Sequence, residues 1–219
     1  MNSEITLNAL EEEVTIGDDT LQLKGILGMP ENALGIIVFA HGSGSGRFST
    51  RNNMVARVLQ KAKFATLLMD LLTDEESLDR NNVFDINLLS SRLNFAKHWL
   101  LNHKKINLKI GYFGASTGAA AALTAAALEP EHVYAIVSRG GRPDLAKHLL
   151  KRVKAPTLLL VGGLDGIVIE LNQEAFNQLE SIKDIKIIPG ATHLFEEPGT
   201  LEQVAEYATQ WFTRYILPE

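Results

Sequence analysis

Six short runs of apolar and β-branched residues recur along this chain, and segments with helical periodicity separate them. Runs this short and this apolar are typical of strands that are covered on both faces, as in a parallel sheet. The runs span residues 35–40, 64–70, 109–115, 133–138, 156–161 and 184–188. Because strands that alternate with helices fold into layered domains, this feature predicts a three-layer α/β architecture.

The ends of the chain carry two further structural signals. Residues 5–16 and 21–29 alternate around Gly17-Asp18-Asp19, which predicts an antiparallel hairpin at the entrance of the fold. Near the other end, apolar residues recur at helical spacing from Leu201 to Tyr215. Thr200 and Gln203 have the spacing of a capping box at the start of this last helix.

Length and composition limit the classes of function. The 219 residues contain 46% hydrophobic residues, with no repeat or linker, so we expect a single domain over residues 1–219. A net charge of −5 argues against nucleic acid and anionic membranes as partners. The absence of cysteine excludes disulfides and a cysteine nucleophile, and the N-terminus does not resemble a signal peptide. We therefore expect a cytoplasmic protein, in which the uncharged stretch 110–128 is buried and does not span a membrane.

A nucleophile motif lies at the end of the third apolar run. Gly114, Ser116 and Gly118 form G-x-S-x-G where this run meets an Ala-rich helical segment. A serine on such a sharp turn needs small residues two positions before and after it, because strand and helix pass closely there. The pattern predicts that Ser116 is a nucleophile. The alternative is a serine that caps a buried helix.

An acid and a base follow Ser116 in the order that such a site requires. Asp165 lies in a glycine-rich loop after the fifth run, and His193 lies in a loop after the sixth. A serine hydroxyl is a weak nucleophile until a base takes its proton and a third group orients that base. We expect His193 to be the base and Asp165 the orienting acid of a catalytic triad. The alternatives are a loop-capping carboxylate and a solvated or buried structural histidine.

Backbone amides next to these residues are candidates for an oxyanion hole. One is the amide of Thr117, and the second is expected in the loop after the first parallel strand, from Ser43 or alternatively Gly44. This loop is not a dinucleotide fingerprint, because Arg47 occupies its third glycine position, and it has no lysine for a P-loop. No histidine pair has metal-ligand spacing, so we expect neither a cofactor nor a metal.

These motifs resemble those of the α/β-hydrolase superfamily, and together with the small size of the chain they are most similar to its dienelactone-hydrolase-like branch. The matching stretches are FAHGSGSG, YFGASTGAA, LLVGGLDGIV and PGATHLF. The resemblance implies an eight-stranded, mostly parallel sheet with no large cap domain and with the site at its C-terminal edge. Dienelactone hydrolases use a cysteine nucleophile, so the serine here implies ordinary esterase chemistry. The chain also resembles hydrolase modules that some bacteria fuse to phosphoribosyltransferases.

Basic residues near the predicted site are candidates for substrate binding. Arg139 and Arg142 flank Gly140-Gly141 at the end of a strand, where they are placed to hold a carboxylate or a phosphate. Arg47 and Arg51, which follow the oxyanion loop, are candidates for the same role. The alternatives are a solvated helix face and a loop buttress. Asp144, after the same strand, is an alternative orienting acid.

The sequence thus predicts a serine hydrolase that cleaves a carboxylic ester of a small molecule through an acyl-enzyme. A thioesterase, a lactonase and an acyltransferase share this site and remain alternatives. From another class, a hydrolase-fold protein that binds a small ligand without turnover is the third hypothesis. Both a monomer and a homodimer are compatible with the sequence.

Overall fold

The computed structural model describes residues 10–102 and 106–217 of the chain. The strands are β1 (Leu10–Gly17), β2 (Gln22–Met29), β3 (Gly35–Ala40), β4 (Phe64–Met69), β5 (Ile110–Ala115), β6 (Val133–Arg139), β7 (Thr157–Gly162) and β8 (Lys183–Ile188). The α-helices are α1 (Thr50–Lys61), α2 (Arg80–Phe84), α3 (Ile86–Asn102), α4 (Thr117–Leu128), α5 (Gly166–Gln178) and α6 (Thr200–Ile216). Two 3₁₀ helices, η1 (Glu76–Leu78) and η2 (Pro143–Arg152), lie between them.

The strands of the described residues form one eight-stranded sheet in the order β1-β2-β4-β3-β5-β6-β7-β8. The strands from β3 to β8 pair in parallel, whereas β2 pairs antiparallel with both β1 and β4. Each of the six predicted runs is a strand, with ends that shift by no more than one residue. The expected mostly parallel sheet and its antiparallel entrance are confirmed, although residues 5–9 of the predicted hairpin lie outside the described residues.

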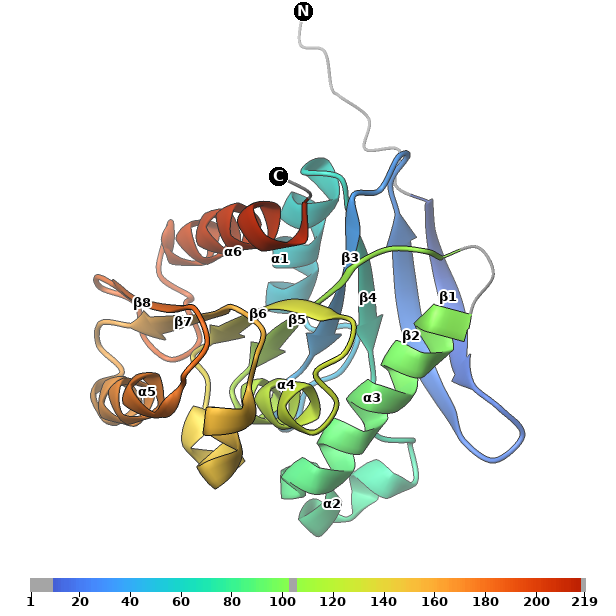
Figure 1. Cartoon of the computed structure of the whole chain (residues 1–219), viewed down its shortest axis with the longest axis horizontal. Helices are drawn as coiled ribbons and strands as arrows, with labels where there is room; N and C mark the ends of the chain where they lie inside the picture. Colours follow the sequence, from blue (N-terminus) through green and yellow to red (C-terminus); the bar gives the residue numbers. More distant parts are fainter. Residues whose placement is uncertain (1–9, 103–105, 218–219) are drawn as a thin grey trace, which may run out of the picture.

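Helices cover both faces of this sheet (Figure 1). On one face α1 and α6 pack together over an apolar cluster that includes Phe39, Phe113 and Phe212. On the other face α3, α4, η2 and α5 form a continuous layer, in which each neighbouring pair is in contact. The result is a three-layer α/β/α fold of the α/β-hydrolase type, as expected.

β5 and α4 form the buried centre of the fold. All residues of β5 are buried, and so are all residues of α4 except the last. Since alanine and glycine predominate in α4, the helix can approach the sheet closely on one side and α3 and η2 on the other. The stretch 110–128 is thus a buried strand and helix, as predicted. Among the described residues, no helix combines the length and the apolar character that crossing a membrane requires.

The predicted capping box of the last helix is wrong. Gly199, with a φ of 80°, precedes α6, so Thr200 is already its first helical residue. The Thr200 hydroxyl donates to the carbonyl oxygen of Glu197 (2.7 Å), and the Gln203 side chain donates to that of Gly199 (3.1 Å). Because both side chains act as donors to carbonyl oxygens, the hydroxyl–amide bond that defines a capping box does not form.

Candidate active site

Ser116 lies on the sharp turn between β5 and α4. Its backbone angles, φ 52° and ψ −120°, belong to a region that residues with a side chain rarely adopt. A Cβ atom at Gly114 would lie 2.4 Å from the Ala119 Cα, and one at Gly118 would lie 2.2 Å from the Ala40 carbonyl oxygen. Both contacts are with backbone atoms, so they confirm that the positions two before and two after Ser116 must be glycine.

The turn is fixed by backbone hydrogen bonds to the end of β6 and to the loop after it. The Ser116 amide donates to the Arg139 carbonyl oxygen (3.2 Å), and the Ser116 carbonyl accepts from the Arg142 amide (3.1 Å). Ser116 occupies the N-cap position of α4, yet its side chain makes no capping hydrogen bond. The helix-capping alternative therefore does not describe what the hydroxyl does in this structure.

Asp165 and His193, which are 28 residues apart in sequence, are joined by a hydrogen bond. The Asp165 Oδ2 lies 2.6 Å from the His193 Nδ1, and the two side chains are 13% and 38% exposed. Asp165 heads α5, but its carboxylate makes no capping hydrogen bond there. Since Nδ1 faces a carboxylate, it carries the proton, and Nε2 is the ring nitrogen that can accept another one.

Ser116 and His193 line the same cavity, which has a volume of about 210 Å³. Its other walls come from the loop after β3, from the start of α1 and from the end of β6. The residues concerned include Gly42, Ser43, Ser45, Ser49, Arg51, Asn52 and Arg139. The structure thus brings the three predicted catalytic residues to one edge of the sheet, where the C-terminal ends of the parallel strands meet.

The predicted oxyanion residues lie where this loop contacts the turn. The Ser43 amide donates to the Thr117 Oγ1 (3.1 Å), and a Cβ atom at Gly42 would lie 3.2 Å from that of Ser116. Because the Ser43 amide already has an acceptor, it can serve a substrate oxygen only by sharing or exchanging this bond. Gly44, with a φ of 71°, lines the neighbouring cavity together with Ser43.

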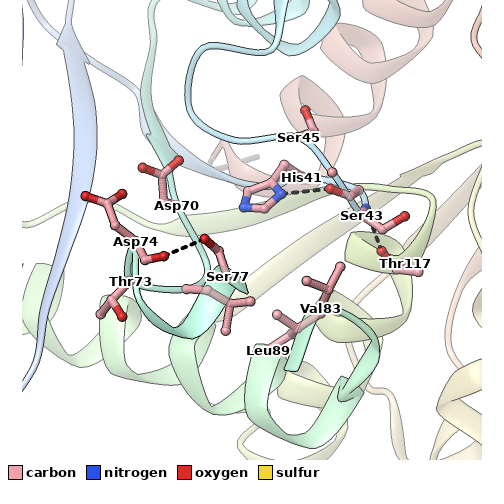
Figure 2. A pocket seen from close by; sticks show the side chains of 13 residues that line it. His41, Ser43, Ser45, Asp70, Thr73, Asp74, Ser77, Val83, Leu89 and Thr117 are labelled. Atoms are coloured by element: carbon pink, nitrogen blue, oxygen red, sulfur yellow. Dashed lines mark hydrogen bonds between the residues drawn. The ribbon is translucent and has the colours of Figure 1, made fainter. Parts of the chain in front are cut away.

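That neighbouring cavity, of about 330 Å³, is lined by the same loop. Figure 2 shows its contrasting walls: Val83 and Leu89 form an apolar side, and Asp70 and Asp74 lie toward the opposite end. It shares Gly42, Ser43 and Ser45 with the cavity of Ser116. The two cavities therefore adjoin each other along this loop.

His41 anchors the start of the oxyanion loop. Its Nδ1 donates to the Gly42 carbonyl oxygen (2.9 Å, Figure 2), and its Nε2 accepts from the Leu71 amide (3.0 Å). These two bonds together require the neutral ring. Burial lowers the pKa of His41, against the opposite effects of the Gly42 hydrogen bond and the Asp70 charge.

The four arginines predicted to contact substrate have different surroundings. Arg139 and Arg51 line the cavity of Ser116. Arg142 instead forms two hydrogen bonds of 2.9 Å to Asp144, and Arg47 forms an ion pair with Asp70. Neither Arg142 nor Arg47 is among the residues that line this cavity, because each is held by a carboxylate outside it. The bond to Arg142 also occupies Asp144, so the carboxylate that reaches His193 is that of Asp165.

Two polar residues of the cavity wall, Ser49 and Asn52, have no counterpart among the sequence predictions. Both lie at the start of α1, and Asn52 is 2% exposed. A polar residue within an amphipathic helix gives no sequence signal that it faces a cavity. Among the described residues, no group of three or more histidine and acidic side chains is arranged to hold a metal ion.

Comparison with known proteins agrees with this arrangement. The sequence pattern of the Dienelactone hydrolase family matches residues 23–216. The chain belongs to this family. A solved dienelactone hydrolase from Anabaena variabilis is 55% identical, with a TM-score of 0.92 over 95% of this chain and 99% of that chain.

More distant members of the fold include enzymes from other organisms. The esterase Pf2001 of Pyrococcus furiosus has a TM-score of 0.76 at 18% identity, over 96% of this chain and 94% of its own. Est1E from Butyrivibrio proteoclasticus has a TM-score of 0.78 at 17% identity, over 92% of this chain and 98% of its own. At such low identity these likenesses concern the fold. The family match over residues 23–216 is what supports a hydrolase.

A curated relative is considerably longer than this chain. It comes from Mycobacterium tuberculosis, its name provisionally describes a phosphoribosyl transferase, and it is 56% identical over 207 residues. The match covers 94% of this chain and 47% of the relative, so the chain spans about half the length of that protein. The name therefore describes a protein that also contains a region without a counterpart in the chain described here.

Proposed function

We propose that this protein is a serine hydrolase that cleaves a carboxylic ester of a small molecule. Ser116 is the nucleophile, His193 the general base and acid, and Asp165 the group that orients the imidazole. The observation that carries this proposal is the 2.6 Å bond between Asp165 and His193, on a histidine that shares a cavity with Ser116. An acid that orients a base beside a strained serine is the arrangement that acyl transfer requires.

The reaction proceeds in two halves. His193 Nε2 takes the proton of the Ser116 hydroxyl as Oγ attacks the ester carbonyl carbon, and the carbonyl π electrons move onto its oxygen. When the intermediate collapses, the bond to the alcohol oxygen breaks and His193 gives its proton to that oxygen. A water molecule then attacks the acyl-enzyme while His193 takes its proton. The second collapse returns a proton to Ser116 and releases the carboxylic acid.

The negative oxygen of each intermediate needs hydrogen-bond donors near Ser116. We assign this role to the amides of Thr117 and Ser43, with Gly44 as the alternative to Ser43. The bond from the Ser43 amide to the Thr117 hydroxyl holds the loop close to the turn before substrate binds. An oxyanion would replace this neutral acceptor with a charged and stronger one.

The same acyl-enzyme would serve a thioesterase, a lactonase or an acyltransferase, which differ only in the leaving group or the acceptor. An esterase, a thioesterase and a lactonase all use water as the acceptor, whereas an acyltransferase needs a second substrate; among the hydrolytic activities we propose the esterase. A non-catalytic ligand-binding protein would have no need for the strained backbone of Ser116. We further propose that the protein acts in the cytoplasm on a small-molecule substrate.

The test combines turnover with labelling of the nucleophile. Wild type is expected to hydrolyse short-chain p-nitrophenyl esters and to be labelled by an organophosphonate at Ser116, as located by mass spectrometry. Ser116→Ala should lose both the label and the activity, with a decrease in kcat of about 10⁶-fold.

A serine exposed on α3 provides the matched control. Ser91 lies outside both cavities, and its hydroxyl donates to the Leu88 carbonyl oxygen (2.7 Å). Ser91→Ala should retain the label and the activity of wild type. Wild-type protein that neither hydrolyses any of these esters nor takes the label would refute the proposed function and favour the binding protein.

A further inference from the structure

Arg139 is a buried cation in the wall of the Ser116 cavity. It lies at the end of β6 and is 7% exposed. Its Nη2 lies 3.5 Å from the Asn52 Oδ1, which is the limit of a hydrogen bond. Its Nε is buried without any hydrogen-bond partner among the described residues. The guanidinium has five N–H donors, and the protein provides one distant, neutral acceptor for them.

Among the described residues that line the cavity, none is acidic, and a second arginine adds positive charge near Arg139. Arg51 lines the same cavity, and its Nε is also buried and unpartnered. The carboxylate bound to Arg51 is that of Glu196, whose side chain is 62% exposed and lies outside the lining of the cavity. Burial, followed by the Arg51 charge, lowers the pKa of Arg139 to about 10. Arg139 is therefore still a cation at neutral pH.

A buried charge without a partner is destabilising, so a protein that retains one has a use for it. The ring of Phe195 lies 5.9 Å from the Arg139 guanidinium carbon, at the outer limit of a cation–π contact. Such a contact provides no hydrogen-bond acceptor for Nε. Because the cation faces the cavity that contains Ser116, the acceptor that matches it is an anionic group of a bound molecule.

The remaining donors of the wall indicate which anion fits best. The first turn of α1, a 12-residue helix, contains no acidic residue, and the N-cap Ser49 lines the cavity. Ser43 and Ser45, on the loop after β3, line the same cavity and add two hydroxyl donors. A helix N-terminus and donors from several directions favour a tetrahedral anion with three free oxygens over a planar carboxylate with two.

We propose that Arg139 and Arg51, with the N-terminal turn of α1, form a subsite for a phosphate group of the substrate. This inference rests on the proposed function, because it places the phosphate on the same molecule whose ester bond Ser116 attacks. The substrate class is then a small phosphorylated ester. The end of the substrate that lacks the phosphate would occupy the neighbouring cavity beside Val83 and Leu89.

The test compares three p-nitrophenyl esters with acyl groups of similar length, which end in a methyl, a carboxylate or a phosphonate group. Butyrate, succinate and 3-phosphonopropionate provide these acyl groups, and the uncatalysed rates are subtracted. Wild type should have its highest kcat/KM with the phosphonate ester. Arg139→Met should reduce the ratio of the phosphonate to the butyrate kcat/KM by about 10- to 100-fold, since hydrogen bonds to a charged group are lost.

Controls separate this effect from a change in folding or in chemistry. Arg57, an exposed arginine on the same helix α1, is the matched control, and Arg57→Met should leave the ratio unchanged. If Arg139→Met does not fold, Arg51→Met tests the same subsite, because its side chain is 31% exposed. Arg51→Met should also decrease the ratio of the phosphonate to the butyrate kcat/KM.

Inorganic phosphate gives an independent measure of binding. It should inhibit the hydrolysis of the butyrate ester competitively, and calorimetry should detect its binding to wild type but not to Arg139→Met. An unchanged ratio in the folded arginine variants would overturn the subsite, and a preference for the succinate ester would overturn its assignment to phosphate. If wild type hydrolyses none of the esters, the proposed function fails. Calorimetry then tests the phosphate subsite separately: phosphate that binds to wild type but not to Arg139→Met supports the subsite, and phosphate that does not bind to wild type overturns it.

Discussion

The backbone conformation of Ser116 should reverse the usual order of stability between an alanine and a glycine variant. Ser116→Ala and Ser116→Gly both remove the hydroxyl, so each should lose ester hydrolysis. They differ in the Cβ atom, which alanine keeps and glycine lacks. At an ordinary position the alanine variant would be the more stable one, because glycine loses more conformational freedom on folding. At a φ of 52° and a ψ of −120°, we expect the glycine variant to be the more stable.

The size of the difference follows from two opposing contributions. The strained conformation costs a residue with a side chain about 1–3 kcal/mol, and glycine avoids this cost. Against it stands the additional entropy that glycine loses on folding, about 0.4–1 kcal/mol. The net expectation is that Ser116→Gly exceeds Ser116→Ala in free energy of unfolding by about 1 kcal/mol. In a chain of 219 residues this corresponds to a Tm difference of about 2–4 °C.

Thermal unfolding followed by circular dichroism, with urea unfolding as a second measurement, tests this expectation. Both variants are inactive, so stability can be compared without any contribution from turnover. A matched pair at Ser91, within α3, gives the ordinary order: there Ser91→Ala should be more stable than Ser91→Gly. If Ser116→Ala is also the more stable by about 1 kcal/mol, the turn is not strained and this reasoning fails.

Three further outcomes follow from the site. Asp165→Asn should reduce kcat by about 10⁴-fold in p-nitrophenyl ester assays without preventing folding, since the orienting charge on His193 is lost; a decrease below tenfold would exclude this role. The pKa of His41 in the folded chain is lowered from the ordinary value of 6.5. As the pH falls below 6.5, the unfolded chain therefore takes up a proton at this residue that the folded chain does not. The free energy of unfolding, measured in urea, should therefore fall more steeply in wild type than in His41→Gln between pH 6.5 and 5. The difference in slope should be up to about 1.4 kcal/mol per pH unit. An equal pH dependence would contradict the neutral ring. Val83→Trp should fill part of the cavity of about 330 Å³ and reduce kcat/KM for esters with long acyl chains more than for acetate esters. Equal decreases would show that neither end of the substrate enters this cavity.

Much of the fold and of the candidate site could be predicted because both depend on where strands end. In a parallel sheet the C-terminal ends of all strands lie at one edge, so residues that directly follow strands meet there whatever their separation in sequence. Asp165 follows β7 and His193 follows β8, and these neighbouring strands bring the two side chains within 2.6 Å. Predicting that both residues lie at this edge required only the strand ends, whereas their direct contact also depends on β7 and β8 being neighbours in the sheet.

Contacts that depend on tertiary neighbours could not be predicted in this way. Arg47, Arg139 and Arg142 share the same kind of sequence context, but carboxylates outside the Ser116 cavity pair with Arg47 and Arg142 and leave Arg139 facing it. The sequence also does not place the start of α1 against this cavity. That position follows from the insertion of β3 between β4 and β5, a strand order that only the complete sheet defines. The capping box failed because the glycine before α6 had already taken the cap position.

Three local departures from what folding alone favours meet at one cavity. At position 116 the backbone favours glycine, yet the residue is serine. Asp165 heads a helix without capping it, and its carboxylate binds His193 instead. Arg139 is a buried charge where an apolar residue would be more stable. The backbone of Ser116 and the buried charge of Arg139 each cost stability, and Asp165 forgoes a helix cap for its bond to His193. Because natural sequences keep such conflicts mainly where function requires them, their coincidence around Ser116 supports the proposed active site with an argument that does not depend on any relative.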